Sequence, residues 1–211
     1  MSPQGYLCDR SLAPKQLATP DYAFVANYGY HLDAGQLAEL LQEHCTQRLG
    51  VKYIRDHIIK INGSPDDDIR SLTTAGGMEV EGELFIDCTG LRSILLGEHY
   101  GIPFISRSDS LFNDSALAVQ VPYADGETPI ASQTTSTARS AGWIWDIGLQ
   151  SRRGVGYTYS SSHTGDDAAL QVLRQYVGPE IEALEPRKIG FEPGHREKFW
   201  HRNCIALGMS A

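Results

Sequence analysis

The stretch GWIWDIG at residues 142–148 contains two of the chain's three tryptophans, placed two positions apart. Side chains at positions i and i+2 of a strand point to the same face of a sheet. If this segment is a strand, Trp143, Trp145 and Ile147 therefore form one wide apolar row. Such a row either packs into a core between sheet and helix or forms a wall beside a bound cofactor, and the residues alone leave both interpretations open.

The segments around this stretch favour an antiparallel sheet with one helix. Apolar and polar residues alternate from about 112 to 161, as in SALAVQV and RGVGYTYSS, which is typical of half-buried strands. The segment DDAALQVLRQYV at 166–177 is amphipathic and predicts a helix. Its expected inner positions are Leu170, Leu173 and Val177.

The first part of the chain predicts an extended segment followed by a helix. Residues 1–29 have weak periodicity and three prolines, so we expect them to cross a surface in extended form. Residues 33–49 form the clearest helical pattern, with Asp33 as the amino-terminal cap and Gln36 as its capping-box partner. The expected inner stripe consists of Leu37, Leu40, Leu41, His44 and Cys45. Residues 51–61 predict a strand pair or a bent strand.

Two apolar strands that end in small residues are the strongest hint of a ligand site. After a predicted hairpin at 69–82, ELFIDCTG at 83–90 and NCIALGMSA at 203–211 lack alternation, which suggests strands covered on both faces of a parallel sheet. Ligands in open α/β sheets bind beyond the carboxyl ends of strands, and glycine allows close approach of the backbone. The ends at Thr89–Gly90 and Gly208–Ser210 are thus either ligand contacts or merely tight turns.

Composition excludes several classes of function. The chain has 211 residues, 41% of them hydrophobic, and a net charge of −8, which argues against nucleic acid as a partner. Arg152 and Arg153 are the nearest approach to a basic patch, and we expect them to be solvated in a turn. No secretory signal or membrane-spanning run is visible. Cys88 and Cys204 lie in strands that look buried, no CxxC occurs, and the scattered histidines predict no metal site.

The same residues carry a resemblance to a known family. GWIWDI resembles the W-x-W-x-I signature of flavin-dependent (tryptophan) halogenases. LFIDCTGLRSILL and NCIALGMSA resemble two other stretches of that family, in the same order, and YAFVANYGYHLDAGQLAELL resembles the segment before the second half of its flavin site. The resemblance extends from about Gly5 to Ala211.

The resemblance implies a fold of the α/β class (mixed α+β). Its main part would be an FAD/NAD(P)-binding Rossmann-like module of the flavin monooxygenase type, formed by residues 1–111 and 203–211. An antiparallel substrate-side sheet with a helix would occupy 112–202. We expect this fold to be incomplete at both ends, because the chain has no amino-terminal GxGxxG and none of the family's segment with the catalytic lysine, and it ends before the family's glutamate-bearing loop.

The resemblance also implies an activity with its cofactor and partners. The family uses reduced FAD, supplied by a separate flavin reductase, together with O2 and halide. It chlorinates or brominates tryptophan, indole or a similar aromatic substrate. We expect a cytoplasmic enzyme with no nucleic acid or membrane partner, and a homodimer is left open. This chain is expected to be an internal fragment or a truncated gene product that is inactive alone. The alternatives are a flavin-dependent monooxygenase and a non-catalytic ligand-binding remnant.

Particular residues acquire expected roles through the resemblance. Ile58 matches the strand near the adenine side of FAD. The positions that match flavin contacts are Thr89, Gly90, Gly208 and Met209. The row of Trp143, Trp145 and Ile147 would separate the substrate from the flavin. No catalytic residue is assigned in this chain, since neither Lys15 nor Lys52 lies in a matching motif. Gly148 replaces the proline that is common after the signature, which suggests a substrate other than free tryptophan.

Overall fold

The computed structural model describes residues 3–211, which fall into two compact units. Unit 1 comprises the described residues up to Leu49 together with Asn113–Gly190, and unit 2 comprises Gly50–Phe112 and Phe191–Ala211. The division expected from sequence shares the boundary near residue 112. It differs in the grouping of residues 3–49 and 191–202. The mixed α/β class predicted from sequence is confirmed, with antiparallel sheets and one parallel strand pair.

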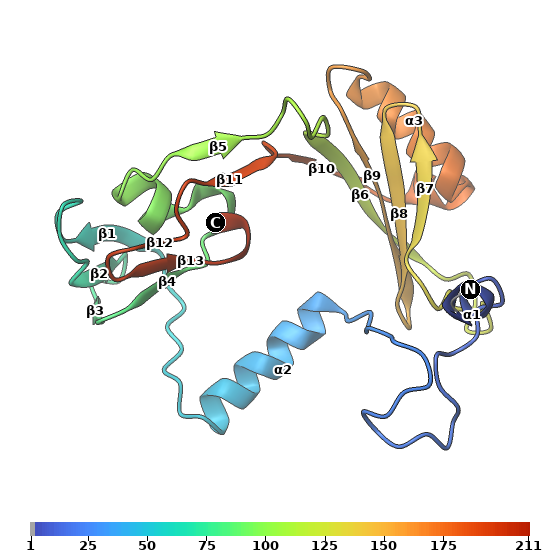
Figure 1. The fold of residues 1–211 in the computed structure, drawn as a ribbon, viewed down its shortest axis with the longest axis horizontal. Coiled ribbons are helices and arrows are strands. Elements are labelled where there is room, and N and C mark those ends of the chain that lie inside the picture. The colour runs from blue at the N-terminus through green and yellow to red at the C-terminus, as the bar shows by residue number, and fades with distance from the viewer. Residues whose placement is uncertain (1–2) are drawn as a thin grey trace. The chain divides into compact units, whose positions relative to one another are not determined.

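Unit 1 is built around a five-stranded antiparallel sheet (Figure 1). The strands follow the order β10-β6-β9-β8-β7. The elements of this unit are α1 (Pro3–Cys8), α2 (Ala34–Gln47), β6 (Ser115–Pro122), β7 (Thr135–Arg139), β8 (Gly142–Gly148), β9 (Arg152–Tyr159), α3 (Asp166–Val177), a 3-10 helix (Pro179–Ala183) and β10 (Arg187–Gly190). The alternation between 112 and 161 and the helix at 166–177 were therefore predicted correctly.

Helix α3 covers one face of this sheet (Figure 1), and the core of unit 1 lies between them. Ile144 of β8 stands opposite Tyr157 of β9, and both are almost fully buried. The buried residues of this core are Leu117, Val119, Val121, Ile144, Val155, Tyr157, Tyr159, Ala169, Leu173, Val177 and Ile181. The inner positions Leu173 and Val177 were predicted correctly, whereas the buried Ala169 was missed because alanine contributes little to an apolar pattern.

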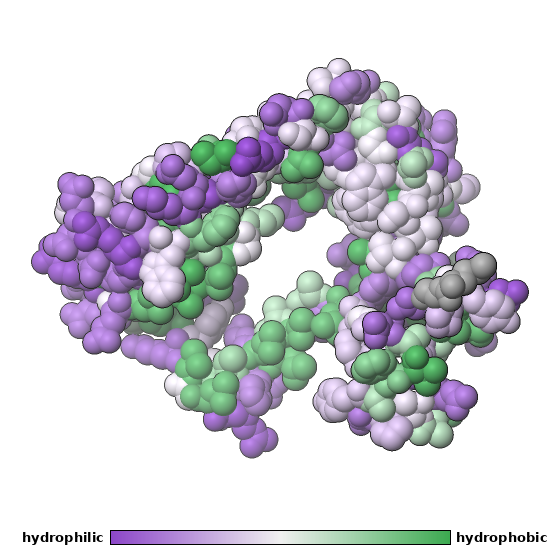
Figure 2. All heavy atoms as spheres, in the orientation of Figure 1, coloured by the Kyte–Doolittle hydropathy of each residue, from purple (hydrophilic) through white to green (hydrophobic). Residues whose placement is uncertain are grey.

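Helix α2 has the predicted cap but not the predicted burial. The Asp33 carboxylate accepts hydrogen bonds from the backbone N–H groups of Gly35 and Gln36, as expected for an amino-terminal cap. None of the residues Ala34–Gln47 is buried, and Leu40 is 62% exposed. Figure 2 shows apolar side chains along the visible face of α2. In the expected inner stripe, Leu40, Leu41 and His44 are exposed, and Leu37 and Cys45 are half-buried. Periodicity identifies an apolar face but not the partner that would bury it.

The amino-terminal segment also differs from its prediction. We expected residues 1–29 to be extended, and the described part instead begins with helix α1, followed by turns and irregular chain. Pro3 is the first residue of α1, a position where proline costs no intrahelical hydrogen bond. Residues 1 and 2 lie outside the described part of the chain.

Unit 2 consists of short strands in three small sheets, with the orders β1-β2-β3, β12-β13-β4 and β11-β5. Its strands are β1 (Ile58–Asn62), β2 (Ser71–Thr74), β3 (Glu79–Glu81), β4 (Phe85–Asp87), β5 (Phe104–Ser106), β11 (Gly194–Arg196), β12 (Trp200–His201) and β13 (Cys204–Ala206). The predicted hairpin at 69–82 is confirmed as β2 and β3, with Leu72 opposite Val80. Of the strand expected over 51–61, only β1 forms.

Strands β4 and β13 are parallel neighbours, with Ile86 opposite Ile205 and Asp87 opposite Ala206. Asp87 is fully buried, but Ile86 is 53% exposed, so the expectation that this strand is covered on both faces is wrong for the described chain. Cys204 is buried as predicted, whereas Cys88 is exposed. Cys88 follows the last residue of β4, outside the strand ladder that would have enclosed it.

We expect Leu173→Ala to lower the free energy of unfolding of unit 1 by about 2–5 kcal/mol, because it removes a fully buried side chain between α3 and the sheet. The matched control is Gln171→Ala, an exposed position on the same helix, which should change stability by less than about 0.5 kcal/mol. Urea denaturation followed by circular dichroism measures both. Equal effects of the two variants would contradict the packing described for α3.

Candidate functional site

The ends of β4 and β13 form one edge in unit 2, because parallel neighbours have their carboxyl ends on the same side. Each strand is followed by a 3-10 turn, Gly90–Arg92 and Gly208–Ser210. The Ser210 Oγ donates to the carbonyl of Gly90 at 3.2 Å, and the Ser93 Oγ donates to the carbonyl of Ser210 at 2.8 Å. The two strand ends expected to contact a ligand are therefore joined in one structure.

The glycines at these ends have the conformation that a turn requires. Gly90 has a φ of 72° and Gly208 a φ of 64°, both in the left-handed region that glycine adopts without strain. A Cβ at either position would meet no atom of the described chain within 4 Å. Met209 is 70% exposed beside them. The edge thus offers open backbone that a flat ligand can approach, which fits a dinucleotide cofactor.

Asp87 organises this edge from beneath and was not predicted from the sequence. Its buried carboxylate accepts hydrogen bonds from the N–H of Thr89 at 3.0 Å and from the Thr89 Oγ1 at 2.6 Å. It also accepts from the N–H groups of Leu95 and Leu96, both at 2.9 Å, at the start of the π-helix Ile94–His99. The available signal was a carboxylate at the end of an apolar strand, directly before a turn.

The hydrogen bonds keep Asp87 charged. Burial by itself would raise the pKa of this carboxyl, but the bonds from Thr89, Leu96 and Leu95 outweigh burial and leave the pKa below its ordinary value. Burial, with a smaller contribution from the Asp87 charge, raises the pKa of the neighbouring Cys204 thiol to about 11. Cys204 is therefore a neutral, buried thiol that packs like a small hydrophobic residue.

Ile58 lies elsewhere in unit 2. It is the first residue of β1, opposite Thr74 of β2, and it is half-buried. The register of β1 with β2 is irregular just after it. The structure places Ile58 in a different sheet from β4 and β13, so its expected role near the adenine of FAD stays a prediction.

The tryptophan row belongs to unit 1 and lies on the face of β8 opposite α3. The ring centroids of Trp143 and Trp145 are 6.2 Å apart at an interplanar angle of 64°, an edge-to-face arrangement. Trp143 is 41% exposed, and Trp145 and Ile147 are half-buried, whereas Ile144 between them is fully buried. Within the described chain, the row therefore lies outside the core that β8 forms with α3.

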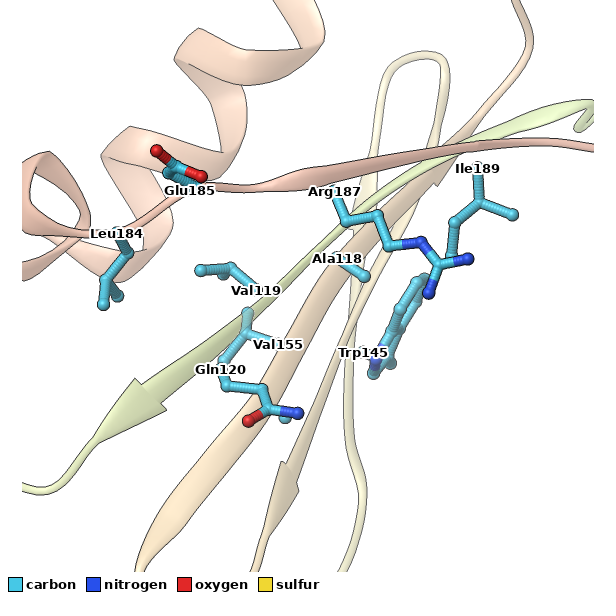
Figure 3. A pocket seen from close by; sticks show the side chains of 10 residues that line it. Ala118, Val119, Gln120, Trp145, Val155, Leu184, Glu185, Arg187 and Ile189 are labelled. Carbon is cyan, nitrogen blue, oxygen red and sulfur yellow. The ribbon is translucent and has the colours of Figure 1, made fainter. Parts of the chain in front are cut away.

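A pocket of about 540 Å³ opens beside this row in unit 1. Trp145, Arg187 and Ile189 line one end of it, and Leu184 and Glu185 line the other (Figure 3). Its lining thus combines an indole and aliphatic side chains with one positive and one negative charge. Such a mixture can hold an amphipathic aromatic molecule, with the apolar part fixing its plane and the charges its orientation.

The two arginines expected to be solvated are instead ion-paired at the start of β9. Arg152 lies 2.7 Å from Asp33, the cap of α2, and its hydrogen bond lowers the pKa of that carboxyl. Arg153 lies 2.6 Å from Asp146 of β8, which also accepts from the Tyr176 hydroxyl at 3.2 Å. Both arginine side chains are less than one-third exposed, because β9 places them next to acidic partners. The spacing of residues in the sequence does not reveal these partners.

Among residues 3–211, no group of three His, Cys, Asp or Glu side chains is arranged to hold a metal ion. Within that range, no helix has the length and apolar character required to cross a bilayer.

Comparison with known proteins gives a consistent set of relatives. The sequence model of the family described as tryptophan halogenase matches residues 5–211. The chain is 39% identical to tryptophan 6-halogenase SttH of Streptomyces toxytricini over 184 residues, 87% of this chain and 35% of that one. It is 33% identical to tryptophan 7-halogenase RebH of Lentzea aerocolonigenes over 207 residues, 97% of this chain and 38% of that one.

Solved structures agree with the sequence relatives. The tryptophan halogenase of Shewanella frigidimarina superposes with a TM-score of 0.93 at 54% identity, covering 99% of this chain and 40% of that one. BrvH, a flavin-dependent halogenase from Brevundimonas sp. BAL3, superposes with a TM-score of 0.88 at 36% identity, covering 100% and 42%. The chain therefore spans well under half the length of the relatives it matches.

We expect Asp87→Asn to destabilise unit 2. Both oxygens of the carboxylate accept hydrogen bonds, whereas the amide of asparagine has only one acceptor oxygen. Each buried donor left without an acceptor costs about 1–3 kcal/mol. Asp66→Asn, at an exposed position, is the matched control and should leave the free energy of unfolding unchanged. Urea denaturation at neutral pH distinguishes the two.

The Asp87 substitution should also change the pH dependence of stability. Because the folded-state pKa of Asp87 is lowered, its contribution is complete above the ordinary value of 3.8 and is lost as the pH falls through the folded-state pKa. The difference in stability between the native protein and Asp87→Asn should therefore shrink on acidification below about pH 4. A difference that is constant with pH would show that the Asp87 charge does not hold this edge.

Proposed function

The chain belongs to the tryptophan halogenase family, and from this premise we propose that the protein containing it is a flavin-dependent halogenase. The observation that carries the proposal is the joined pair of strand ends in unit 2, where Gly90 and Gly208 present open backbone. The flat ring system of a flavin can approach such an edge closely, because no Cβ stands in its way. We therefore assign the edge formed by β4 and β13 to flavin binding and the five-stranded sheet to the substrate side.

Thr89, Gly90, Gly208 and Met209 are the residues that we propose hold FAD, with Ile58 toward the adenine side. Asp87 does not contact the cofactor in this scheme, but it fixes Thr89 through two hydrogen bonds. Reduced FAD, when bound, supplies with O2 the oxidising power that converts halide into an electrophilic halogen. The residues of this chain bind and orient the cofactor and restrict what reaches it, and none of them is assigned a proton transfer.

The substrate that we propose is an electron-rich aromatic ring of the tryptophan or indole class. The row of Trp143, Trp145 and Ile147 is apolar, is not needed for the α3 core, and lies on an open sheet face, which supports its role as a wall between substrate and flavin. Gly148 after the signature favours a substrate other than free tryptophan. A separate flavin reductase and a cytoplasmic location complete the proposal.

Halide dependence tests the proposed function directly. The protein containing this chain is supplied with reduced FAD from a flavin reductase, O2 and tryptophan or indole, with bromide, chloride or neither. Mass spectrometry should detect a halogenated ring only when halide is present. An oxygenated ring formed equally with and without halide would favour the alternative, a flavin-dependent monooxygenase. Absence of both products from a panel of indoles would contradict both enzymes.

Replacing both tryptophans of the row with alanine should change what the enzyme makes from each reduced flavin. Each indole buries roughly 150–250 Å², so the double substitution Trp143→Ala and Trp145→Ala opens the proposed wall widely. We expect less halogenated product per flavin oxidised, with oxygenated product appearing. Trp200→Ala, which removes an exposed indole outside the row, is the control. An unchanged product profile in the double variant would contradict the wall.

The 211 residues by themselves should bind FAD weakly and halogenate nothing. The sequence contains no GxGxxG turn, whose backbone amides at a helix amino terminus would hold the pyrophosphate. Titration of FAD, followed by quenching of flavin fluorescence, should show little binding at micromolar concentrations of chain. Purification of the chain as a yellow protein with one flavin per molecule would contradict this expectation.

A further inference from the structure

Gly156 of β9 lies directly opposite Trp145 of β8 on the open face of the five-stranded sheet. A Cβ built on Gly156 would lie 2.0 Å from Cζ2 of Trp145 and 2.3 Å from its Cη2. Non-bonded carbon atoms are normally about 3.5–4.0 Å apart. The indole therefore occupies the volume that any side chain at position 156 would need.

The backbone of β9 does not itself require a glycine at this position. Gly156 does not have a positive φ. It pairs regularly with Trp145 on one side and Ala118 on the other. Glycine within a strand usually weakens it, since it has no side chain to pack and loses more conformational freedom. The reason for a glycine here is thus the ring above it.

Gly154 provides a matched comparison in the same strand. It lies two positions away on the same face, opposite Ile147. Within the described chain, a Cβ on Gly154 would have only the Ile147 carbonyl oxygen within reach, at 4.0 Å, which is an ordinary contact. The two glycines therefore share strand, face and sheet, and they differ in whether an indole covers them.

We propose that Gly156 is a positioning residue: its missing side chain forms the seat on which the Trp145 indole lies against the sheet. The seat sets the plane of Trp145, and with it the edge-to-face contact with Trp143 and one end of the pocket lined by Arg187. The consequence for catalysis rests on the proposed function, whereas the seat itself rests only on the geometry of β8 and β9.

Tryptophan fluorescence tests the seat without any activity. In the protein containing this chain, Trp143→Phe and Trp200→Phe, together with phenylalanine at any tryptophan outside these 211 residues, leave Trp145 as the reporter. Gly156→Ala should move its emission to longer wavelength and increase its quenching by acrylamide, because the displaced ring becomes more exposed. Gly154→Ala should leave both unchanged. Equal behaviour of the two alanine variants, or an unchanged emission in Gly156→Ala, would overturn the proposal.

A rescue experiment covers the case in which Gly156→Ala does not fold. In the Trp145→Leu background the ring atoms that clash with the new methyl group are absent. We expect Gly156→Ala to be tolerated there, with a denaturation midpoint close to that of Trp145→Leu alone. If the alanine is as harmful in this background as in the native protein, the glycine serves the backbone and not the indole, and the proposal is wrong.

The catalytic consequence is measured separately, in the halide-dependent assay. Gly156→Ala should lower the ratio of halogenated product to flavin oxidised, in the direction of Trp145→Ala. An unchanged ratio with a displaced ring would overturn the catalytic half of the proposal. If the native protein gives no halide-dependent product, the proposed function fails, while the fluorescence and rescue experiments still decide whether Gly156 seats the ring.

Discussion

The parallel pairing of β4 with β13 is the interaction on which the candidate cofactor edge depends. It brings together segments such as Ser93 and Ser210, which are 117 positions apart in the sequence and are joined by a hydrogen bond of 2.8 Å. Parallel neighbours cannot be linked by a tight turn, so the intervening chain has to leave this sheet and return. Unit 1 contains most of that intervening chain, including the five-stranded sheet, and the chain then returns to pair β13 with β4.

Asp87 fixes the conformation of the turns that follow β4. A strand end with glycines is intrinsically mobile. Binding to a mobile edge is weaker, because part of the binding free energy is spent on ordering the edge. The Asp87 carboxylate ties the Thr89 turn and the start of the π-helix to the last residue of β4. Its charge is retained in a buried place because donors surround it. The edge is thus held by hydrogen bonds to Asp87, while the backbone at Gly90 and Gly208 stays open.

The sequence predicted those features that depend on local pattern. Residues 166–177, the hairpin at 69–82 and the Asp33 cap follow from periodicity and turn chemistry, and the structure agrees. The partners of charged groups could not be predicted, because the ion pairs of Arg152 and Arg153 join segments whose proximity only the fold creates. The roles assigned to the glycine ends and the tryptophan row follow from the family resemblance, because local pattern does not distinguish a ligand contact from a tight turn.

On the open face of the unit 1 sheet, a glycine can fix the position of an aromatic ring although it has no side chain of its own. On the α3 face, large side chains fill the space between helix and sheet, and close packing sets the position of each side chain. On the other face no helix of the described chain fills that role, so Trp145 has to be held by the sheet itself. A flat floor under the ring provides maximal contact area, and only a residue without Cβ leaves that floor flat. Gly156 and Trp145 therefore act as a pair: the missing side chain of Gly156 leaves room for the ring, and the ring fills that room.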